Sequence, residues 1–344
     1  MLLFQKTLSR VAAPISVAAN LILILLIIFK SPAQMGNYKY LLIGLSIFEM
    51  SYAVLDVVSE TTVLSIKKSF VVVVPYKDRS FGQETAMDIN LIYCGFFGFS
   101  MGMFVVIFAY RSFLTTGNTI LRKFEGFKII SWFAYPLFYA IVWILVAWGP
   151  LASFPEMDIV VRPFLLDELN MTVDEVAYTG RLFYSTIDNS LRYSAILTGV
   201  LQWVLTASSL FLVIFFGLRC YFHYGKLVQL TDVQSIRLRQ LQNQLFLALV
   251  CQATVPLILM HIPVTILYTC CVLNIVFNPF SVATTIALFP AIDPLPTIFI
   301  VKNYRVALFE FVCPSCLCWS ETLKHMGSNR ITSYRSNTVN ALSM

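Results

Sequence analysis

Seven long apolar runs, separated by polar segments, dominate the hydrophobic pattern of this chain. A helix that crosses a bilayer needs about 20 mostly apolar residues, and each run is close to that length or longer. The pattern therefore predicts an all-α membrane protein, a bundle of seven transmembrane helices. A shorter β-branched run, FVVVVP at 70–75, cannot span a bilayer, and we interpret it as a loop. The predicted spans cover about residues 8–29, 40–58, 90–110, 127–150, 194–218, 245–273 and 281–301.

The amino-acid composition also favours a multi-pass membrane protein. Hydrophobic residues make up 58% of the 344 residues, charged residues only 12%, and the mean hydropathy is +0.77. Soluble domains carry about 25% charged residues, so the composition excludes an ordinary soluble domain. The three histidines are scattered along the chain, and no phosphate-binding loop, zinc-protease helix or nucleophile elbow occurs. We therefore expect no enzymatic activity, no cofactor, no metal and no nucleic-acid partner.

Lysine and arginine are unevenly distributed between the two sets of loops. With the N-terminus outside, the inner segments carry 15 of the 24 Lys and Arg residues. Cytoplasmic loops of membrane proteins carry such an excess. The one Asn-x-Ser/Thr triplet begins at Asn170, in a long segment that this orientation places outside. We therefore predict an extracellular N-terminus, a cytoplasmic C-terminus and a glycosylated Asn170.

The seventh apolar run contains a carboxylate, Asp293, and three prolines, Pro290, Pro294 and Pro296. Proline leaves a helix carbonyl without its donor, but in a bilayer neighbouring side chains and bound waters can satisfy that carbonyl. We therefore expect a kinked or loosened helix. A carboxylate in mid-membrane is costly, so Asp293 should face the bundle interior and have a partner.

Depth along the helices indicates the partners of Asp293. At about 1.5 Å per residue, Asp293 lies about 13 Å above the inner end of its span. Glu49 in the second span and Asn20 in the first lie at similar depths. We predict a buried polar cluster of Asn20, Glu49 and Asp293, with a shared proton, waters or a cation between the carboxyls. The alternative is a protonated Glu49 that bonds a neighbouring hydroxyl.

Four segments in this order resemble one family: MGNYKYLLIGLSIFEMSYAVLD (35–56), FAYRSF (108–113), RLRQLQNQLFLALVCQATVPLILMHIP (237–263) and FPAIDPLPTIFIVKNYR (289–305). They resemble the nematode serpentine chemoreceptors of the Str/Srj type, which include a receptor for the odorant diacetyl. The resemblance covers about residues 10–315. It implies a GPCR-like fold in the plasma membrane of sensory cilia. It also implies an olfactory receptor that detects an odorant or soluble chemical and activates a heterotrimeric G protein.

The resemblance implies roles at the cytoplasmic end. Arg111 corresponds to the switch arginine of rhodopsin-like receptors, although the acid that precedes it there is absent. The segment 231–246 begins with a capping-box pattern and predicts a helical extension of the sixth span. Movement of such an extension opens a groove for a G protein helix. The residues expected at the G protein or the anionic leaflet are Tyr110, Arg111, Arg237 and Arg239.

In such a bundle, a small-molecule site should be apolar with a few polar groups and lie in the outer half. His261, Gln202 or Tyr268 could donate to a small ketone. The alternative is that these side chains only pack against lipid or against each other. The candidates, chosen by depth, are Phe97, Ser100, Gln202, Trp203, His261, Tyr268 and Thr285.

Cys94 lies where rhodopsin-like receptors have a disulfide cysteine, but the segment 151–193 has no cysteine to pair with it. Cys270 and Cys271 are alternative partners, although we favour a free buried thiol. The segment after Lys302 predicts a short amphipathic helix at the membrane surface. Palmitoylation is expected on Cys313, Cys316 and Cys318. Residues 1–319 would then form the receptor domain, and 320–344 a disordered cytoplasmic tail.

Two other functional classes remain open. A ligand-gated odorant channel has seven spans in the opposite orientation, so the location of the C-terminus discriminates it from a receptor. A small transporter could use Glu49 and Asp293 as a proton relay. Uptake or current in cells that lack G proteins would favour either alternative.

Overall fold

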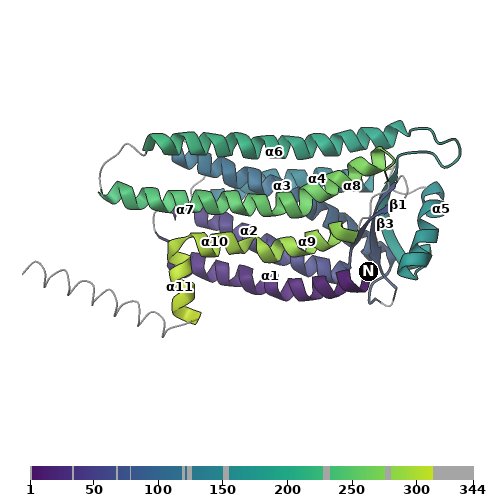
Figure 1. The fold of residues 1–344 in the computed structure, drawn as a ribbon, viewed down its shortest axis with the longest axis horizontal. Coiled ribbons are helices and arrows are strands. Elements are labelled where there is room, and N and C mark those ends of the chain that lie inside the picture. Colours follow the sequence, from purple (N-terminus) through teal and green to yellow (C-terminus); the bar gives the residue numbers. More distant parts are fainter. Residues whose placement is uncertain are drawn as a thin grey trace, which may run out of the picture.

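The computed structural model describes residues 2–32, 35–66, 69–77, 79–117, 121, 126–149, 155–227, 233–275 and 280–312. Within these residues, seven segments are long and apolar enough to cross a membrane, which confirms the predicted bundle (Figure 1). The spans are Phe4–Lys30, Tyr38–Ser59, Gln83–Thr115, Lys128–Trp148, Tyr193–His223, Arg239–Val272 and Val282–Ile300.

Four of the spans are single helices, and three are interrupted. The single helices are α1 (Leu2–Lys30), α2 (Tyr38–Ser59), α3 (Gln83–Thr115) and α6 (Tyr193–Leu227). The fourth span starts as a 3-10 helix, Gly126–Phe133, and continues as α4 (Ala134–Trp148). The sixth comprises α7 (Val233–Pro256), a π-helical turn (Leu257–His261) and α8 (Ile262–Val272). The seventh comprises α9 (Phe280–Ile292) and α10 (Pro294–Ile300).

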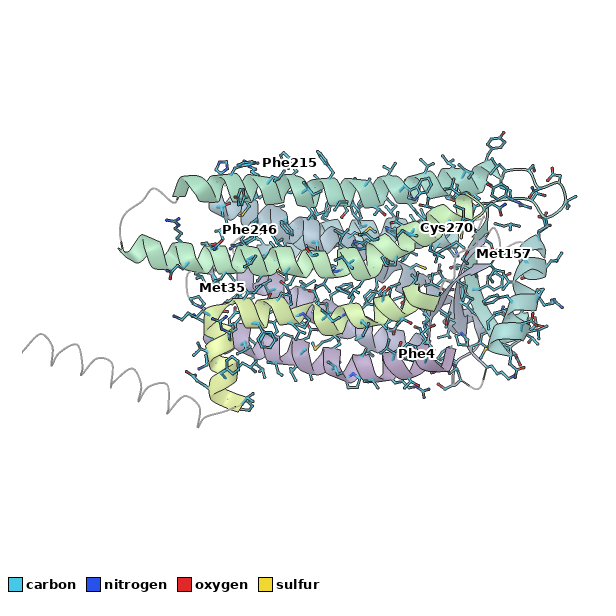
Figure 2. The ribbon with its side chains drawn as sticks, in the orientation of Figure 1. Phe4, Met35, Met157, Phe215, Phe246 and Cys270 are labelled. Carbon is cyan, nitrogen blue, oxygen red and sulfur yellow. The ribbon has the colours of Figure 1, made fainter. Side chains whose placement is uncertain are left out.

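Helix α3 lies at the centre of the bundle and is buried over most of its length. Glycines allow α4 to approach it closely. A Cβ atom on Gly98 would lie 2.3 Å from Cδ1 of Trp143, and one on Gly102 would lie 2.5 Å from Cα of Pro136. Small residues permit this close packing in membranes, where lipid tails remove the hydrophobic drive between helices. Large side chains such as Phe215 on α6 lie instead on the outer surface (Figure 2).

The seventh span breaks at Asp293, between α9 and α10. Pro294 has no N–H to donate to the carbonyl of Pro290, one turn earlier. From α1, Ser16 Oγ donates to that carbonyl at 2.9 Å and Asn20 Nδ2 at 3.0 Å. The loosened helix expected from the prolines is therefore present, and neighbouring side chains satisfy the group that proline leaves free.

A small antiparallel sheet covers one end of the bundle, which we call the sheet end (Figure 1). Its strands are β1 (Thr62–Ile66), β2 (Ser69–Pro75) and β3 (Val176–Leu182), with β2 in the middle. Helix α5 (Pro155–Phe164) packs on the outer face of this sheet.

The interpretation of 70–75 as a loop is therefore wrong, because these residues form most of β2. Their β-branched side chains suit a pleated sheet. The run shows no polar alternation because both faces of the strand are buried. Val72 packs into the bundle core, whereas Val71 and Val73 pack outward with Met157 of α5.

At the other end, which we call the Arg111 end, α11 (Lys302–Val312) turns away from the bundle axis (Figure 1). The Tyr304 hydroxyl anchors it with a 2.7 Å hydrogen bond to Ser31 after α1. This helix begins at Lys302, after which the sequence predicts a short amphipathic helix. Cys313, Cys316 and Cys318 and the tail 320–344 lie outside the described residues.

Candidate functional site

A cavity of about 60 Å³ lies under the sheet, and a smaller one of about 20 Å³ adjoins it. We call the two together the sheet-end cavity. Its walls come from α3, α4, α6, α8 and α9, and its roof from β1, β2 and β3. The larger part is lined by Val63, Phe70, Val72, Tyr93, Cys94, Phe97, Trp143, Ala147, Thr179, Gly180, Arg181, Gln202, Val264 and Ile286.

Four of the seven predicted ligand residues line this cavity. Phe97 and Gln202 line both parts of it, and Trp203 and Tyr268 line the smaller part. The Phe97 and Trp143 rings meet edge to face at 4.9 Å and form part of the cavity wall. The cavity is thus mostly aromatic and aliphatic, as a small-molecule site should be.

The other three predicted ligand residues lie elsewhere. His261 and Ser100 approach each other at 3.4 Å, and the His261 ring contacts the Phe97 ring edge to face at a centroid distance of 5.4 Å. His261 also lines an apolar groove of about 540 Å³ between α3, α6 and α7. Thr285 donates to the carbonyl of Val282 in its own helix at 2.9 Å and does not line the cavity.

The sheet contributes cavity residues that the sequence did not identify, chiefly Phe70, Thr179 and Arg181. Alternation along β3 turns Thr179 and Arg181 toward the bundle and Tyr178 toward α5. Arg181 is only 5% exposed and donates through Nη2 to the carbonyl of Val146 on α4. Recognising these residues requires knowing that 70–75 and 176–182 are paired strands.

In mid-bundle, the structure brings Asn20, Glu49 and Asp293 together, and all three are fully buried. The Glu49 carboxyl lies within hydrogen-bonding range of both the Asp293 carboxyl and the Asn20 amide. Gln252 on α7 adds a fourth member by donating to Asp293 Oδ2 at 3.3 Å. Two carboxylates have no donor between them, so this contact needs a shared proton or a cation. We call these four residues the polar cluster.

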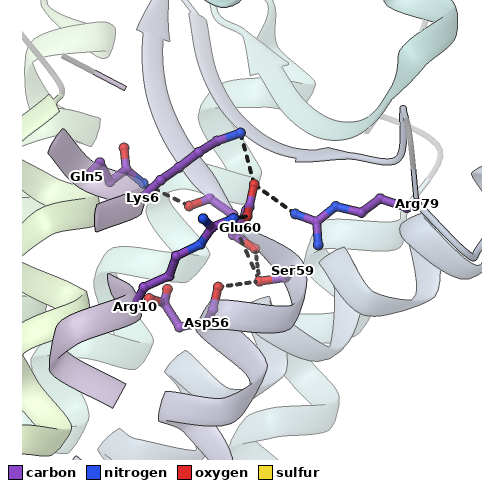
Figure 3. Close-up of polar contacts among 8 residues, drawn as sticks. Gln5, Lys6, Arg10, Asp56, Ser59, Glu60 and Arg79 are labelled. Atoms are coloured by element: carbon purple, nitrogen blue, oxygen red, sulfur yellow. Dashed lines mark hydrogen bonds and ion pairs between the residues drawn. The ribbon is translucent and has the colours of Figure 1, made fainter. Parts of the chain in front are cut away.

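An ion cluster joins α1, the end of α2 and the segment after β2 (Figure 3). Glu60, in a left-handed conformation at the end of α2, pairs with Lys6 at 2.9 Å, Arg10 at 2.9 Å and Arg79 at 2.7 Å. Burial alone would raise the pKa of the Glu60 carboxyl. The hydrogen bond and charge of Lys6, with the two guanidinium groups, outweigh burial and hold this pKa below its ordinary value.

At the Arg111 end, the Arg111 side chain connects α3 with α7. Its Nη1 donates to Gln242 Oε1 at 2.7 Å and its Nη2 to the Gln242 carbonyl at 2.9 Å. The guanidinium also lies 5.0 Å from the ring centroid of Tyr38 on α2, against which Tyr110 stacks at 6.0 Å. Gln242 therefore supplies both acceptors for the terminal nitrogens of Arg111.

The remaining predicted positions are partly described. Arg239 is half-buried on α7, and the side chain of Arg237 lies outside the described residues. Asn170 is exposed beyond α5, on the same side of the bundle as the sheet. Cys94, Cys270 and Cys271 are free thiols, so the described residues do not contain a disulfide between Cys94 and either alternative partner.

Comparisons with known proteins agree on one family. Residues 5–309 match the family described as serpentine type 7TM GPCR chemoreceptor Str. The chain is 26% identical to serpentine receptor class r-10 of Caenorhabditis briggsae over 302 residues, which cover 85% of this chain and 86% of that protein. It is 23% identical to G-protein coupled receptor str-33 of Caenorhabditis elegans, over 89% of this chain and 90% of that protein.

The fold is similar to that of a solved receptor. Squid rhodopsin aligns with a TM-score of 0.57 over 91% of this chain and 85% of its own. The two sequences are 11% identical, so this likeness concerns the fold alone.

Proposed function

Because the chain belongs to the Str family of serpentine seven-transmembrane chemoreceptors, we propose that it binds a small molecule in the sheet-end cavity and activates a heterotrimeric G protein at the Arg111 end. The observation that carries the proposal is the path along α3. This helix lines the cavity with Phe97 and, near its other end, carries Arg111, which contacts α7. One buried helix therefore touches both ends of the bundle.

In this mechanism, the Arg111 contact holds α7 against α3 in the resting receptor. Ligand in the cavity would press on the Phe97 and Trp143 rings and on α8, which continues α7 beyond the π-helical turn. The polar cluster lies between the two ends, with members on α1, α2, α7 and the α9–α10 break. Rearrangement there would release α7 from Arg111 and open a groove for a G protein helix.

The proposed orientation puts the sheet end outside the cell and the Arg111 end in the cytoplasm, with a plasma-membrane or ciliary location. Two features support it: the excess of Lys and Arg in the segments on the Arg111 side, and the exposed Asn170 beyond the sheet. The cysteines at 313, 316 and 318 would then lie on the cytoplasmic side, where palmitoylation occurs. A glycosidase-sensitive mass shift lost in Asn170→Gln, and a C-terminal epitope detected only after permeabilisation, would support this orientation. An epitope accessible on intact cells would exclude it.

The test of function is a reporter assay. Cells that express the full chain with a promiscuous Gα subunit are exposed to volatile and soluble chemicals, and second-messenger release is recorded. We expect a ligand-evoked response in wild type and, at equal surface expression, higher ligand-independent signalling in Arg111→Ala, which removes the contact that holds α7. A ligand-evoked current or uptake that persists in cells without G proteins would reject the receptor mechanism.

A proton-coupled transporter is the second candidate, because the buried Glu49–Asp293 pair would suit proton transfer. It predicts ligand uptake that depends on a proton gradient and is lost in Asp293→Asn. The receptor mechanism predicts no such uptake.

A further inference from the structure

We propose that the ligand held in the sheet-end cavity is a small carboxylate of about two to four carbon atoms, bound by Arg181. This inference rests on the proposed function, because it names the class of molecule that the receptor detects. The sequence alone suggests a neutral ketone, bound by donors on the helices. In the structure, the main donor is instead a cation of the sheet, Arg181.

Arg181 is a buried cation without a carboxylate partner in the described part of the chain. It is 5% exposed, and none of the ion pairs in the structure includes it. The carboxylates of the neighbouring helix α5 have other partners: Glu156 pairs with Arg192, and Asp158 accepts a hydrogen bond from Tyr178 on the outer face of the sheet. A buried, uncompensated charge is costly, and such groups are retained where a partner of opposite charge binds.

Arg181 has one free donor and lines the cavity. Nη2 donates to the Val146 carbonyl, whereas Nη1 has no hydrogen-bond partner, and Arg181 lines the larger part of the cavity. The groups around it are a thiol, Cys94, which bonds Thr179, and the amide of Gln202. None of them carries a negative charge that could neutralise the guanidinium.

Burial lowers the pKa of Arg181 from its ordinary value, but a guanidinium titrates so far above neutrality that it remains charged. A carboxylate would supply the missing charge and present two oxygens to the planar guanidinium. Gln202 lines the same cavity, and its Oε1, which also has no partner, could accept a hydrogen bond from a hydroxyl on the ligand. A neutral ketone would provide one acceptor and leave the charge uncompensated.

Cavity size sets the length of the ligand. A water needs about 10–15 Å³ measured in the same way, so a cavity of about 60 Å³ holds about five heavy atoms. The adjoining 20 Å³, between Trp203 and Tyr268, leaves room for one or two carbons more. The remaining walls are aromatic and aliphatic, which suits a short alkyl group.

The experiment compares acids with their amides. The purified full-length receptor is heated with acetate, propionate or butyrate, and with acetamide, propionamide or butyramide, at pH 7.4 and equal ionic strength. Chloride and bicarbonate serve as small-anion arms. We expect the carboxylates to raise the unfolding temperature and the amides and inorganic anions to leave it unchanged. These comparisons need no variant, so they hold even if a variant does not fold.

Variants then assign the effect to Arg181. Arg181→Gln should raise the Kd for propionate about 10- to 100-fold. Arg181→Lys keeps the charge but loses the paired N–H donors of the planar guanidinium, so it should raise the Kd less. Arg162→Gln, an exposed arginine of α5 at the same end, is the matched control and should bind as wild type does. Removal of a buried unpaired cation should also leave the ligand-free receptor at least as stable as wild type.

Three results would overturn the inference: amides that stabilise the receptor as well as acids do, chloride or bicarbonate that reproduces the shift, or propionate binding that survives Arg181→Gln. Reporter cells separate this failure from failure of the proposed function. Responses to neutral chemicals alone would leave the receptor function in place and reject the carboxylate. Carboxylate binding through Arg181 without any G protein response would support the carboxylate site and reject the receptor function.

Discussion

The guanidinium of Arg111 is fully buried, and both of its terminal nitrogens donate to Gln242 on α7. In Gln242→Ala the backbone bond remains but the side-chain acceptor is lost. One charge-assisted hydrogen bond contributes about 1.5 kcal/mol, so the resting state should lose about tenfold in its population relative to the active one. We expect higher ligand-independent signalling in reporter cells. Gln240→Ala, an exposed position on the same helix, is the control, and equal basal signalling in both variants would contradict a locking role for Gln242.

The polar cluster gives a second prediction at the level of single side chains. Glu49→Gln keeps a group that can bond both Asp293 and Asn20, whereas Glu49→Leu leaves both without that partner. Asn20 keeps its hydrogen bond to the Pro290 carbonyl and Asp293 keeps the one from Gln252, so the cost is that of the lost bonds to Glu49, about 0.5–1.5 kcal/mol each. Thermal unfolding in detergent should therefore rank wild type and Glu49→Gln close together and Glu49→Leu well below them. If the leucine variant were as stable as the glutamine variant, the cluster would not contribute to folding.

At the scale of helices, the contact between α3 and α4 depends on glycine. In Gly102→Ala the new methyl group would meet the backbone of Pro136 at 2.5 Å, and a backbone cannot rotate away as a side chain can. Overpacking of this kind costs about 1–3 kcal/mol, so the unfolding temperature should fall. Gly217→Ala on α6 is the matched control, since its methyl group would meet only the Phe108 side chain, at 3.3 Å. Equal stability of the two variants would show that α4 can shift freely.

The Glu60 ion cluster makes the attachment of α1 to the sheet end sensitive to pH. The pKa of Glu60 is lower in the folded protein than its unfolded value of about 4.3, so its stabilisation is complete above that pH and is lost as pH falls through the folded pKa. Glu60→Gln should therefore lower the unfolding temperature at pH 7 and lower it less near pH 3. Asp88→Asn, at an exposed position of α3, serves as control. The same difference at both pH values would contradict the ion-pair explanation.

For the molecule as a whole, the seven spans and three members of the polar cluster, Asn20, Glu49 and Asp293, could be predicted from the sequence. Hydropathy marks each span because lipid demands a long apolar helix, and the constant rise of a helix converts residue numbers such as 20, 49 and 293 into depth. Gln252 escaped this reasoning because a polar amide in a helix carries no sign of its partner.

The sheet could not be predicted in the same way. Its strands at 62–75 and 176–182 lie about a hundred residues apart, and their pairing depends on contacts that no local pattern encodes. Without knowledge of that pairing, nothing distinguishes Arg181 from the other charged residues of an acidic outer segment. Depth along the helices therefore identified residues of the cavity walls. It did not identify the roof, which the sheet forms, or Arg181, the only cation that lines the cavity among the described residues.

The sheet covers the cavity without a disulfide in the described part of the chain, since Cys94, Cys220, Cys251, Cys270 and Cys271 are free thiols. Packing of β2 between α5 and the bundle, together with the Glu60 ion cluster, is what holds it. Reductant should therefore leave both the unfolding temperature and the ligand response unchanged, whereas loss of a structural disulfide would cost about 2–4 kcal/mol. High salt, which screens the Glu60 pairs, should lower the unfolding temperature of wild type more than that of Glu60→Gln. If reduction lowered the unfolding temperature and Cys94→Ser lowered it equally, a disulfide of Cys94 would be revealed instead. That bond would then limit movement of the sheet.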